Sequence, residues 1–360
     1  MLDIIFPYRN RGIERVKKSL DALANQTNKN FLVHFVDYGS DIETAKQVEV
    51  LVQNYSFAKY QYHPTNFQPW NKSRALNTII KQLKAGFCFV ADIDMIFHPE
   101  FVARAITLQK ENTATYFKVG FLSENETKYS KQFNAYSINF ESTLEATGLT
   151  MFPVKALHKV KGFDEFYHFW GAEDTDVHVR LKNDGCEIVY YEKEILLLHQ
   201  WHKSYRSKES QNITTDLQLG GVVRLNHQHL MYAGFNNKTS VNLSKWGEPL
   251  SKENYQSLMG FSGESKKILN RKEAIDYLLF CKLPEVDKTV MRFEVGLDDF
   301  QNSIKYKVKR LIGKNTPSYY TLKEVNDMLL THIIVFYRDY DYIYRVFESE
   351  NKIELTLKKP

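Results

Sequence analysis

Hydrophobic and polar positions follow two different periods along the first two hundred residues. Short apolar runs at Leu2–Phe6, Phe31–Val36 and Gly86–Ala91 are typical of buried strands. Between them, apolar side chains recur at helical spacing, which predicts amphipathic helices after residue 13, over about 43–54 and over about 75–83. This alternation predicts an α/β fold, with βαβ units on a mostly parallel sheet flanked by helices. Ligands of such sheets bind beyond the carboxyl ends of the strands, so we expect the functional side chains there.

The pattern changes after about residue 200. Asn- and Ser-rich polar sequence from Lys203 to Glu253 predicts long loops or a linker. Beyond it, we expect a helical segment near Ser265–Lys282, a helix opened by a capping box at Thr321–Glu324, and a terminal β-hairpin formed by "YIYRVF" and "KIELTLK". The sequence therefore predicts a main domain over residues 1–255 and a smaller α+β or helical accessory unit over residues 256–360.

Composition narrows the class of protein without deciding its function. Of 360 residues, 43% are hydrophobic and 25% are charged, as in ordinary soluble globular proteins. The formal net charge of +5 is too small to favour nucleic acid as a partner, and it suits an anionic small ligand or membrane surface. The three cysteines lack metal-ligand spacing, and the chain does not start like a signal peptide. Because no apolar run is long enough to span a bilayer, we expect a cytoplasmic protein.

The first two predicted strands end in residue types that bind nucleotides. After the first comes Pro7-Tyr8-Arg9-Asn10-Arg11, whose arginines can meet phosphate and whose tyrosine can stack on a base. After the second comes Asp37, which can accept a hydrogen bond from a nucleobase, followed by Gly39 and Ser40. Ordinary turns would explain both segments equally well, so each is a candidate site only in combination with the others.

Two later strand ends carry metal-ligand types. Asp92 and Asp94 stand two positions apart in "ADIDM", where an extended chain can turn both carboxylates toward one divalent cation. The apolar segment "EILLLHQWH" ends in His199, with His202 three residues later. A lone histidine there usually caps the strand or donates to a carbonyl group. Beside a carboxylate pair, it becomes a candidate metal ligand.

The segment "FWGAEDTDVHVRL" places three carboxylates in the first turn of a predicted helix, where they suit the positive end of the helix dipole. Asp176 and Arg180 are four residues apart and can pair, which gives Asp176 a structural explanation. Trp170 and the pair Glu173–Asp174 have no such explanation. Neighbouring helical residues point about 100° apart, so one carboxylate can face a cleft while the other orients a group beside it.

Taken in order, these motifs resemble those of inverting GT-A glycosyltransferases. The carrying residues are Pro-Tyr-Arg-Asn-Arg, Val-Asp-x-Gly-Ser, Asp-Ile-Asp, Trp-Gly-Ala-Glu-Asp-x-Asp and Leu-Leu-His, between Leu2 and His202. They are most similar to the β-1,4-galactosyltransferase and bacterial chondroitin-polymerase type, which is glycosyltransferase family 2-like. The resemblance implies a GT-A catalytic domain that transfers a sugar with inversion. It would move galactose or N-acetylgalactosamine from a UDP-sugar to a hydroxyl of a glycan or lipid-linked glycan, in bacterial surface polysaccharide synthesis.

The resemblance also implies roles for individual residues. Mn²⁺ or Mg²⁺ would be held by Asp94 and His199, with His202 as an alternative ligand. Asp174 would be the catalytic base, and Glu173 would hold the acceptor hydroxyl. Other sugar contacts would come from Trp170 and Gly171, and nucleotide contacts from Pro7, Tyr8, Arg9, Arg11, Asp37, Arg74, Asn77 and Asp92.

Some features depart from this family pattern and leave alternatives open. Ala172 stands where the family commonly has the second of two glycines, and Tyr38 replaces a frequent acidic residue. A sugar-nucleotide nucleotidyltransferase shares the architecture, but more often has a Gly-rich phosphate loop near its N-terminus. A non-catalytic sugar-binding protein would not need a base, metal ligands and nucleotide-facing arginines together.

The segment "NSIKYKVKRLIGKN", residues 302–315, combines apolar residues at helical spacing with five Lys and Arg. Such a helix can lie on an anionic membrane, here at its inner face. It can also pack as a solvated helix on the main domain, and the sequence leaves both interpretations open.

Overall fold

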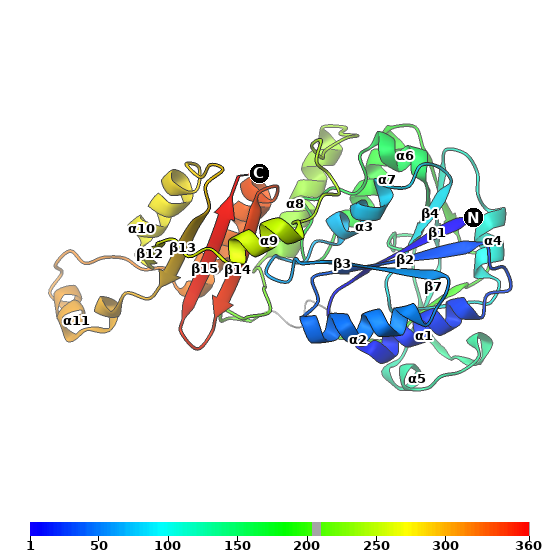
Figure 1. Ribbon diagram of the computed structural model, residues 1–360, viewed down its shortest axis with the longest axis horizontal. Helices are drawn as coiled ribbons and strands as arrows, with labels where there is room; N and C mark the ends of the chain where they lie inside the picture. The colour runs from blue at the N-terminus through cyan, green and yellow to red at the C-terminus, as the bar shows by residue number, and fades with distance from the viewer. Residues whose placement is uncertain (204–209, 360) are drawn as a thin grey trace. The chain divides into compact units, whose positions relative to one another are not determined.

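The computed structural model describes residues 1–203 and 210–359 and divides the chain into two compact units (Figure 1). The first unit comprises residues 1–66, 70–203 and 222–249. The second comprises residues 67–69, 210–221 and 250–359. A single boundary near residue 255 does not describe this division, because two earlier segments pack with the C-terminal part of the chain.

A seven-stranded sheet forms the centre of the first unit, in the order β10-β6-β9-β4-β1-β2-β3. Its strands are β1 (Leu2–Tyr8), β2 (Phe31–Tyr38), β3 (Ala58–His63), β4 (Phe87–Val90), β6 (Thr113–Phe117), β9 (Thr150–Pro153) and β10 (Glu187–Tyr191). β1 pairs in parallel with β2 and β4, whereas β9 is antiparallel to β4 and β6. The predicted mostly parallel sheet is confirmed, and its central strands are mainly apolar because helices cover both faces.

Helices pack on both faces of this sheet, and alternate residues of β1 face opposite layers. Ile4 and Phe6 belong to a core shared with α1 and α2, while Ile5 belongs to a core shared with α3, α6 and α7 (Figure 1). The helices of the first unit are α1 (Ile13–Ala24), α2 (Ile42–Gln53), α3 (Lys72–Ile80), α4 (Phe101–Thr107), α5 (Glu124–Lys128), α6 (Val154–Lys159), α7 (Glu173–Asn183) and α8 (Val222–Phe235).

A second, four-stranded sheet in this unit has the order β5-β11-β7-β8. Its strands are β5 (Met95–Phe97), β7 (Val119–Leu122), β8 (Ile138–Glu141) and β11 (Leu197–His199). β5 and β11 are antiparallel, with His199 opposite Met95. This register brings the end of "ADID" beside the end of "LLLH", although about one hundred residues separate them in the chain.

The second unit is built on its own four-stranded sheet, in the order β12-β13-β15-β14. Its elements are α9 (Lys252–Met259), β12 (Ser265–Leu269), α10 (Lys272–Tyr277), β13 (Met291–Gly296), α11 (Ile304–Leu311), α12 (Leu322–His332), β14 (Asp341–Phe347) and β15 (Lys352–Lys358). β14 and β15 form the predicted hairpin, and Thr321 with Glu324 forms the predicted capping box of α12. Among the described residues, no helix is both long and apolar enough to cross a bilayer.

Two sequence predictions for this half of the chain were wrong. The helix expected over Ser265–Lys282 begins only at Lys272, because residues 265–269 pair in parallel with β13 as a strand. The loops expected over Lys203–Glu253 include the fourteen-residue helix α8. Part of that prediction, residues 204–209, lies outside the described residues.

A buried ion pair fixes α7. The Nε atom of Arg180 lies 2.6 Å from the Oδ2 atom of Asp176, and the two side chains are 0% and 1% exposed. The Arg180 guanidinium also donates to the carbonyl oxygens of Val160 and Gly162. The predicted pairing of Asp176 with Arg180 is thus confirmed, and it holds the helix that carries Glu173 and Asp174.

Replacing Arg180 should destabilise the protein severely. Arg180→Met leaves the buried Asp176 without its cation, so we expect the free energy of unfolding to fall by about 3–5 kcal/mol. Lys17→Met is the matched control, because Lys17 pairs with the exposed Asp21 at the same spacing and should lose less than about 1 kcal/mol. Urea denaturation followed by circular dichroism measures both, and equal losses would contradict this role of Arg180.

Candidate active site

The turn after β2 is built around a buried carboxylate. Asp37 is 0% exposed and accepts hydrogen bonds from the Ser40 N–H and the Tyr60 hydroxyl, each at 2.8 Å. Burial raises the pKa of this carboxyl above its usual value. Gly39 has a φ of +90°, and a Cβ atom there would lie 2.5 Å from the Thr65 carbonyl carbon. The turn predicted at Gly39 therefore requires glycine, and Asp37 is a structural part of it.

Arg9 holds neighbouring strand ends together. Its Nε donates to the Tyr38 carbonyl oxygen and its Nη2 to the Thr65 carbonyl oxygen, both at 2.7 Å. The guanidinium also lies 5.5 Å from the ring centroid of Trp70. These contacts join the end of β2 to the loop after β3, so the backbone positions of this edge depend on Arg9.

Tyr8 is not placed as the sequence predicted. Its side chain is buried, its hydroxyl donates to the Arg11 carbonyl oxygen, and its ring packs 5.1 Å from that of Phe35. A base cannot stack on a ring that already lies in the core, and Pro7 is buried beside it in β1. Arg11, by contrast, is exposed.

Arg74 and Asn77 are also interior residues, which corrects their predicted place on the donor side. The Nε atom of Arg74 lies 2.6 Å from the Oε2 atom of Glu165. The Asn77 side-chain amide donates to the Phe163 carbonyl oxygen at 2.8 Å and accepts from the Phe163 N–H at 2.9 Å. Both residues tie α3 to the loop before α7, because their side of the helix faces that loop.

Lys72, in the same "NKSRALN" segment, is the residue of α3 that reaches the carboxylates. Its Nζ atom lies 3.3 Å from Asp92, 3.4 Å from Glu173 and 3.1 Å from Asp174. The side chain of Asn71 caps α3 by accepting from the Arg74 N–H, which puts Lys72 in the first helical turn. Lys72 was not among the predicted site residues, because its only signal in the sequence is a single cation near a predicted helix start.

Three carboxylates around one ammonium group determine the charge balance of the cluster. Burial raises the pKa of Asp174, and the negative charges of Glu173 and Asp92 raise it further. The positive charge of Lys72 lowers it, and the resulting pKa is about 7. Burial alone would lower the pKa of Lys72, but the carboxylates raise it well above its usual value. Burial would raise the pKa of Asp92, but the nearby Lys72 and Arg11 outweigh burial and lower this pKa.

The loop that leads into α7 has an unusual backbone. Phe169, Gly171 and Ala172 have φ values of 62°, 102° and 73°, in the left-handed region that L side chains rarely adopt. Asn226 of α8 secures this loop by donating to the carbonyl oxygens of His168 and Trp170. The loop leaves the Trp170 side chain partly exposed, with 43% of its surface accessible. Ala172 thus occupies a conformation that suits the glycine usual in the resembling family.

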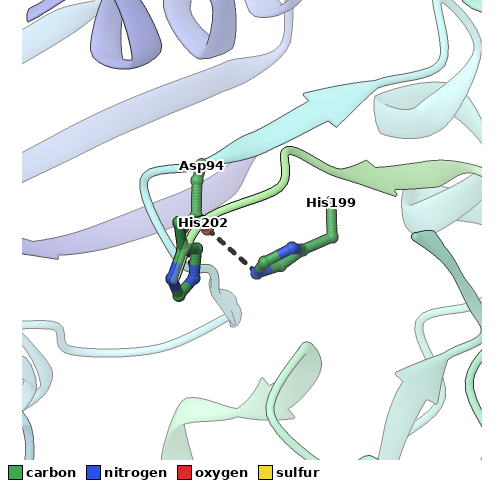
Figure 2. A group of neighbouring side chains, drawn as sticks. All are labelled: Asp94, His199 and His202. Carbon is green, nitrogen blue, oxygen red and sulfur yellow. Dashed lines mark ion pairs between the residues drawn. The ribbon is translucent and has the colours of Figure 1, made fainter. Parts of the chain in front are cut away.

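Asp94, His199 and His202 form a cluster with the composition of a metal site (Figure 2). One ligand atom from each residue lies within 4.8 Å of the others. The Nε2 atoms of His199 and His202 lie 3.5 Å and 3.3 Å from the Asp94 carboxylate. Because β5 and β11 pair beside these residues, both histidines of the sequence alternative reach Asp94.

The donor atoms of this cluster fit a divalent cation. The Oδ1 atom of Asp94 is buried and makes no hydrogen bond within the part of the chain that the structure describes. The Nδ1 atom of His202 lies 2.9 Å from the Lys203 carbonyl oxygen. It must donate that bond, which leaves the Nε2 lone pair toward Asp94. Burial lowers the pKa of His202 and favours the neutral imidazole, and mixed oxygen and nitrogen ligands suit Mn²⁺.

Asp92 connects the two clusters, since it contacts Lys72 of one and stands two residues before Asp94 of the other. Arg11 of the first βα turn and Arg15 of α1 act on the same region. The charge of Arg11 affects the pKa values of both Asp92 and His202, and Arg15 feels the charge of Asp94 and donates to the Trp201 carbonyl oxygen. Arg15 was not among the predicted site residues, because in the sequence it is one of several polar residues of an amphipathic helix.

Two family models match the first unit. Residues 3–158 match the family described as glycosyl transferase family 2, and residues 127–203 match the N-terminal domain of galactosyltransferase. Over these residues the first unit is similar to glycosyltransferases. Its fold class and its enzyme class are therefore those expected from the sequence.

Solved glycosyltransferase structures resemble this one more distantly. The mannosyltransferase PcManGT from Pyrobaculum calidifontis, in complex with GDP-Man and Mn²⁺, is 16% identical with a TM-score of 0.42, over 57% of this chain and 58% of its own. GalNAc-T7 with UDP, GalNAc and Mn²⁺ is 12% identical with a TM-score of 0.49, over 71% of this chain and 52% of its own. This chain thus spans little more than half of each. No curated protein sequence matches it.

The left-handed backbone before α7 makes Gly171 costly to replace in this glycosyltransferase domain. A Cβ atom at Gly171 would meet no atom within 4 Å, so Gly171→Ala tests the backbone alone. We expect a loss of about 1–2 kcal/mol in unfolding free energy. Gly234 in α8 has equal space and no positive φ, so Gly234→Ala should stabilise by about 0.5–1 kcal/mol. Thermal denaturation compares the two, and opposite signs are the expected result.

Proposed function

We propose that the protein transfers a sugar from a UDP-sugar to a hydroxyl group of a glycan or lipid-linked glycan, with inversion at the anomeric carbon. The observation that carries this proposal is the pair of clusters at one edge of the sheet. Asp174, whose pKa is raised to about 7, belongs to one cluster, the metal-type group of Asp94 to the other, and Asp92 lies between them. A base and a cation site side by side are what direct displacement of a nucleoside diphosphate requires.

The proposed donor is UDP-galactose or UDP-N-acetylgalactosamine. The match of residues 127–203 to a galactosyltransferase domain supports this sugar type. Among the predicted nucleotide residues, the exposed Arg11 and the partly exposed Asp92 are the side chains available for direct contact. Pro7, Tyr8, Arg9 and Asp37 would act through the backbone edge that they hold in place.

The acceptor would bind at the loop before α7. Trp170, with 43% of its surface accessible, would contact the sugar, and Gly171 lets the chain turn without a side chain in the way. Glu173 would hold the acceptor hydroxyl and Asp174 would accept its proton. A base with a pKa near 7 is well matched to this task near neutral pH, because about half of it is unprotonated there and it is still basic.

A divalent cation held by Asp94, His199 and His202 would neutralise the negative charge that develops on the leaving diphosphate. The exposed guanidinium of Arg11 would stabilise the same charge from the first βα turn. Lys72 keeps Glu173 and Asp174 in place and balances part of their charge. As the acceptor oxygen bonds to the anomeric carbon, its proton would pass to a carboxylate oxygen of Asp174.

Asp174→Asn should remove most turnover and leave donor binding intact. The amide keeps the shape of the carboxyl group but cannot accept the proton, so we expect kcat to fall by about 10²–10⁴-fold. Binding of UDP with Mn²⁺, measured by calorimetry, should change less than about twofold, because it does not involve the base. Asp184→Asn, at the other end of α7, is the matched control. Near wild-type turnover in Asp174→Asn would exclude it as the base.

The same residue should set the acid limb of the pH profile. Because Asp174 must be unprotonated to act, kcat/KM should fall about tenfold per pH unit below about 7. Asp174→Asn should lose this limb, whereas Asp184→Asn should keep it. An acid limb that persists unchanged in Asp174→Asn would assign it to another group.

Mn²⁺ binding can be tested without turnover. Titration of the protein with Mn²⁺, followed by electron paramagnetic resonance, should show one site whose affinity falls at least about tenfold in Asp94→Asn, His199→Ala and His202→Ala. His227→Ala replaces an exposed histidine of α8 and serves as the control. Unchanged affinity in all three ligand variants would show that the cluster does not hold the metal.

Product analysis separates this proposal from the functions left open by the sequence. A transferase releases UDP and forms a glycosidic bond, a nucleotidyltransferase releases diphosphate from UTP, and a binding protein does neither. We propose a role in bacterial surface polysaccharide synthesis on the cytoplasmic side, because sugars carried by UDP are the donors for such polymers in the resembling family.

A further inference from the structure

Helix α11 in the second unit has an apolar face that no described residue of its own unit covers. Ile304, Val308 and Leu311 are 81%, 48% and 86% exposed, and the adjoining Ile312 is 60% exposed. At about 100° per residue, the first three side chains fall within one narrow stripe along the helix. No residue of α11 is buried, so the helix is not packed through this stripe onto its own unit.

The opposite face of α11 anchors the helix. The Tyr306 hydroxyl donates to the Pro317 carbonyl oxygen, and its ring lies 5.7 Å from Phe300 and 5.5 Å from Tyr319. Tyr306 and Arg310 also line a polar cavity of about 1160 Å³ within this unit. The three apolar residues of the stripe do not line it. Because Tyr306 points about 160–180° away from the middle of the stripe, its anchoring turns the stripe toward solvent.

The charges around the apolar stripe all have the same sign. The segment from Ser303 to Asn315 contains Lys305, Lys307, Lys309, Arg310 and Lys314 and no acidic residue. Within the described residues none of these cations forms an ion pair. Lys305 and Lys307 flank the stripe, one on each side at helical spacing. A narrow apolar stripe bordered by free lysines is the arrangement of helices that lie in the plane of a membrane interface.

We propose that α11 binds the surface of an anionic lipid bilayer, with Ile304, Val308 and Leu311 in the acyl boundary and the lysines on lipid headgroups. Exposed apolar residues and unpaired positive charge on one short helix both complement such a surface, while neither alone would. A second copy of this chain is a poor occupant, because its own five cations would meet these five across the interface. The contact does not depend on the sugar-transfer reaction.

Flotation of the full chain with lipid vesicles tests the proposal. We expect recruitment to vesicles with about one third phosphatidylglycerol, and little to pure phosphatidylcholine. Raising NaCl from about 0.1 M to 0.5 M should release most of the protein, because salt screens the lysines. The readout is binding alone, so failure of the sugar-transfer proposal would leave it unaffected.

Two paired variants separate the contributions of the stripe and the charges. Ile304→Asn with Leu311→Asn should lower the vesicle partition coefficient at least about tenfold, as should Lys305→Gln with Lys307→Gln. Ile42→Asn changes an isoleucine that is 60% exposed in the first unit, and Lys46→Gln with Lys59→Gln makes the same change of net charge. Both controls should bind as the wild type does.

Three outcomes would overturn the proposal. The first is absence of recruitment to anionic vesicles, and the second is equal recruitment of the α11 variants and their controls. The third is a combination of results: the wild type does not bind vesicles and sediments as a dimer, and the variant with Ile304→Asn and Leu311→Asn sediments as a monomer. A second copy of the chain would then be the partner of the stripe. All replaced residues are exposed, so circular dichroism should show every variant folded as the wild type.

Discussion

One ammonium group shared by three carboxylates is the interaction on which the proposed site depends. Lys72 comes from α3, Asp92 from the end of β4, and Glu173 with Asp174 from the start of α7. Without the lysine, like charges would force these elements apart or leave the carboxyls protonated. With it, Asp174 has a pKa of about 7, because burial and the neighbouring carboxylates raise this pKa and the single cation only partly opposes them. Assembly and reactivity therefore have the same electrostatic origin.

The surrounding fold supplies the geometry that this charge balance needs. Arg180 and Asp176 fix α7 from within, and Asn226 secures the loop before it from α8. On the metal side, pairing between β5 and β11 brings Asp94 to the histidines. Polar residues that look alike in the sequence thus have two different roles. Some form hydrogen bonds that fix the backbone at the edge of the sheet, and others are accessible there to ligands.

The sequence predicted the layers well and individual side chains less well. Apolar runs identified β1, β2 and β4, because burial on both faces leaves a strong local signal. The direction of a side chain depends on what packs behind it, and this explains the errors at Tyr8, Arg74 and Asn77, which the core had already engaged. Lys72 escaped notice because its partners come from distant segments. β12 was mistaken for helix because "SKKIL" does not alternate between polar and apolar residues. Its strand conformation comes from pairing with β13, which is distant in the sequence.

The path of the chain between its two compact units has a consequence for modularity. Residues 67–69 and 210–221 leave the glycosyltransferase domain and pack with the C-terminal segment, after which the chain returns. A domain gained by simple fusion would join its neighbour through one linker, and either part could be cut away cleanly. Here the two units are interleaved along the chain, so neither can be inherited, exchanged or expressed as an uninterrupted stretch of sequence.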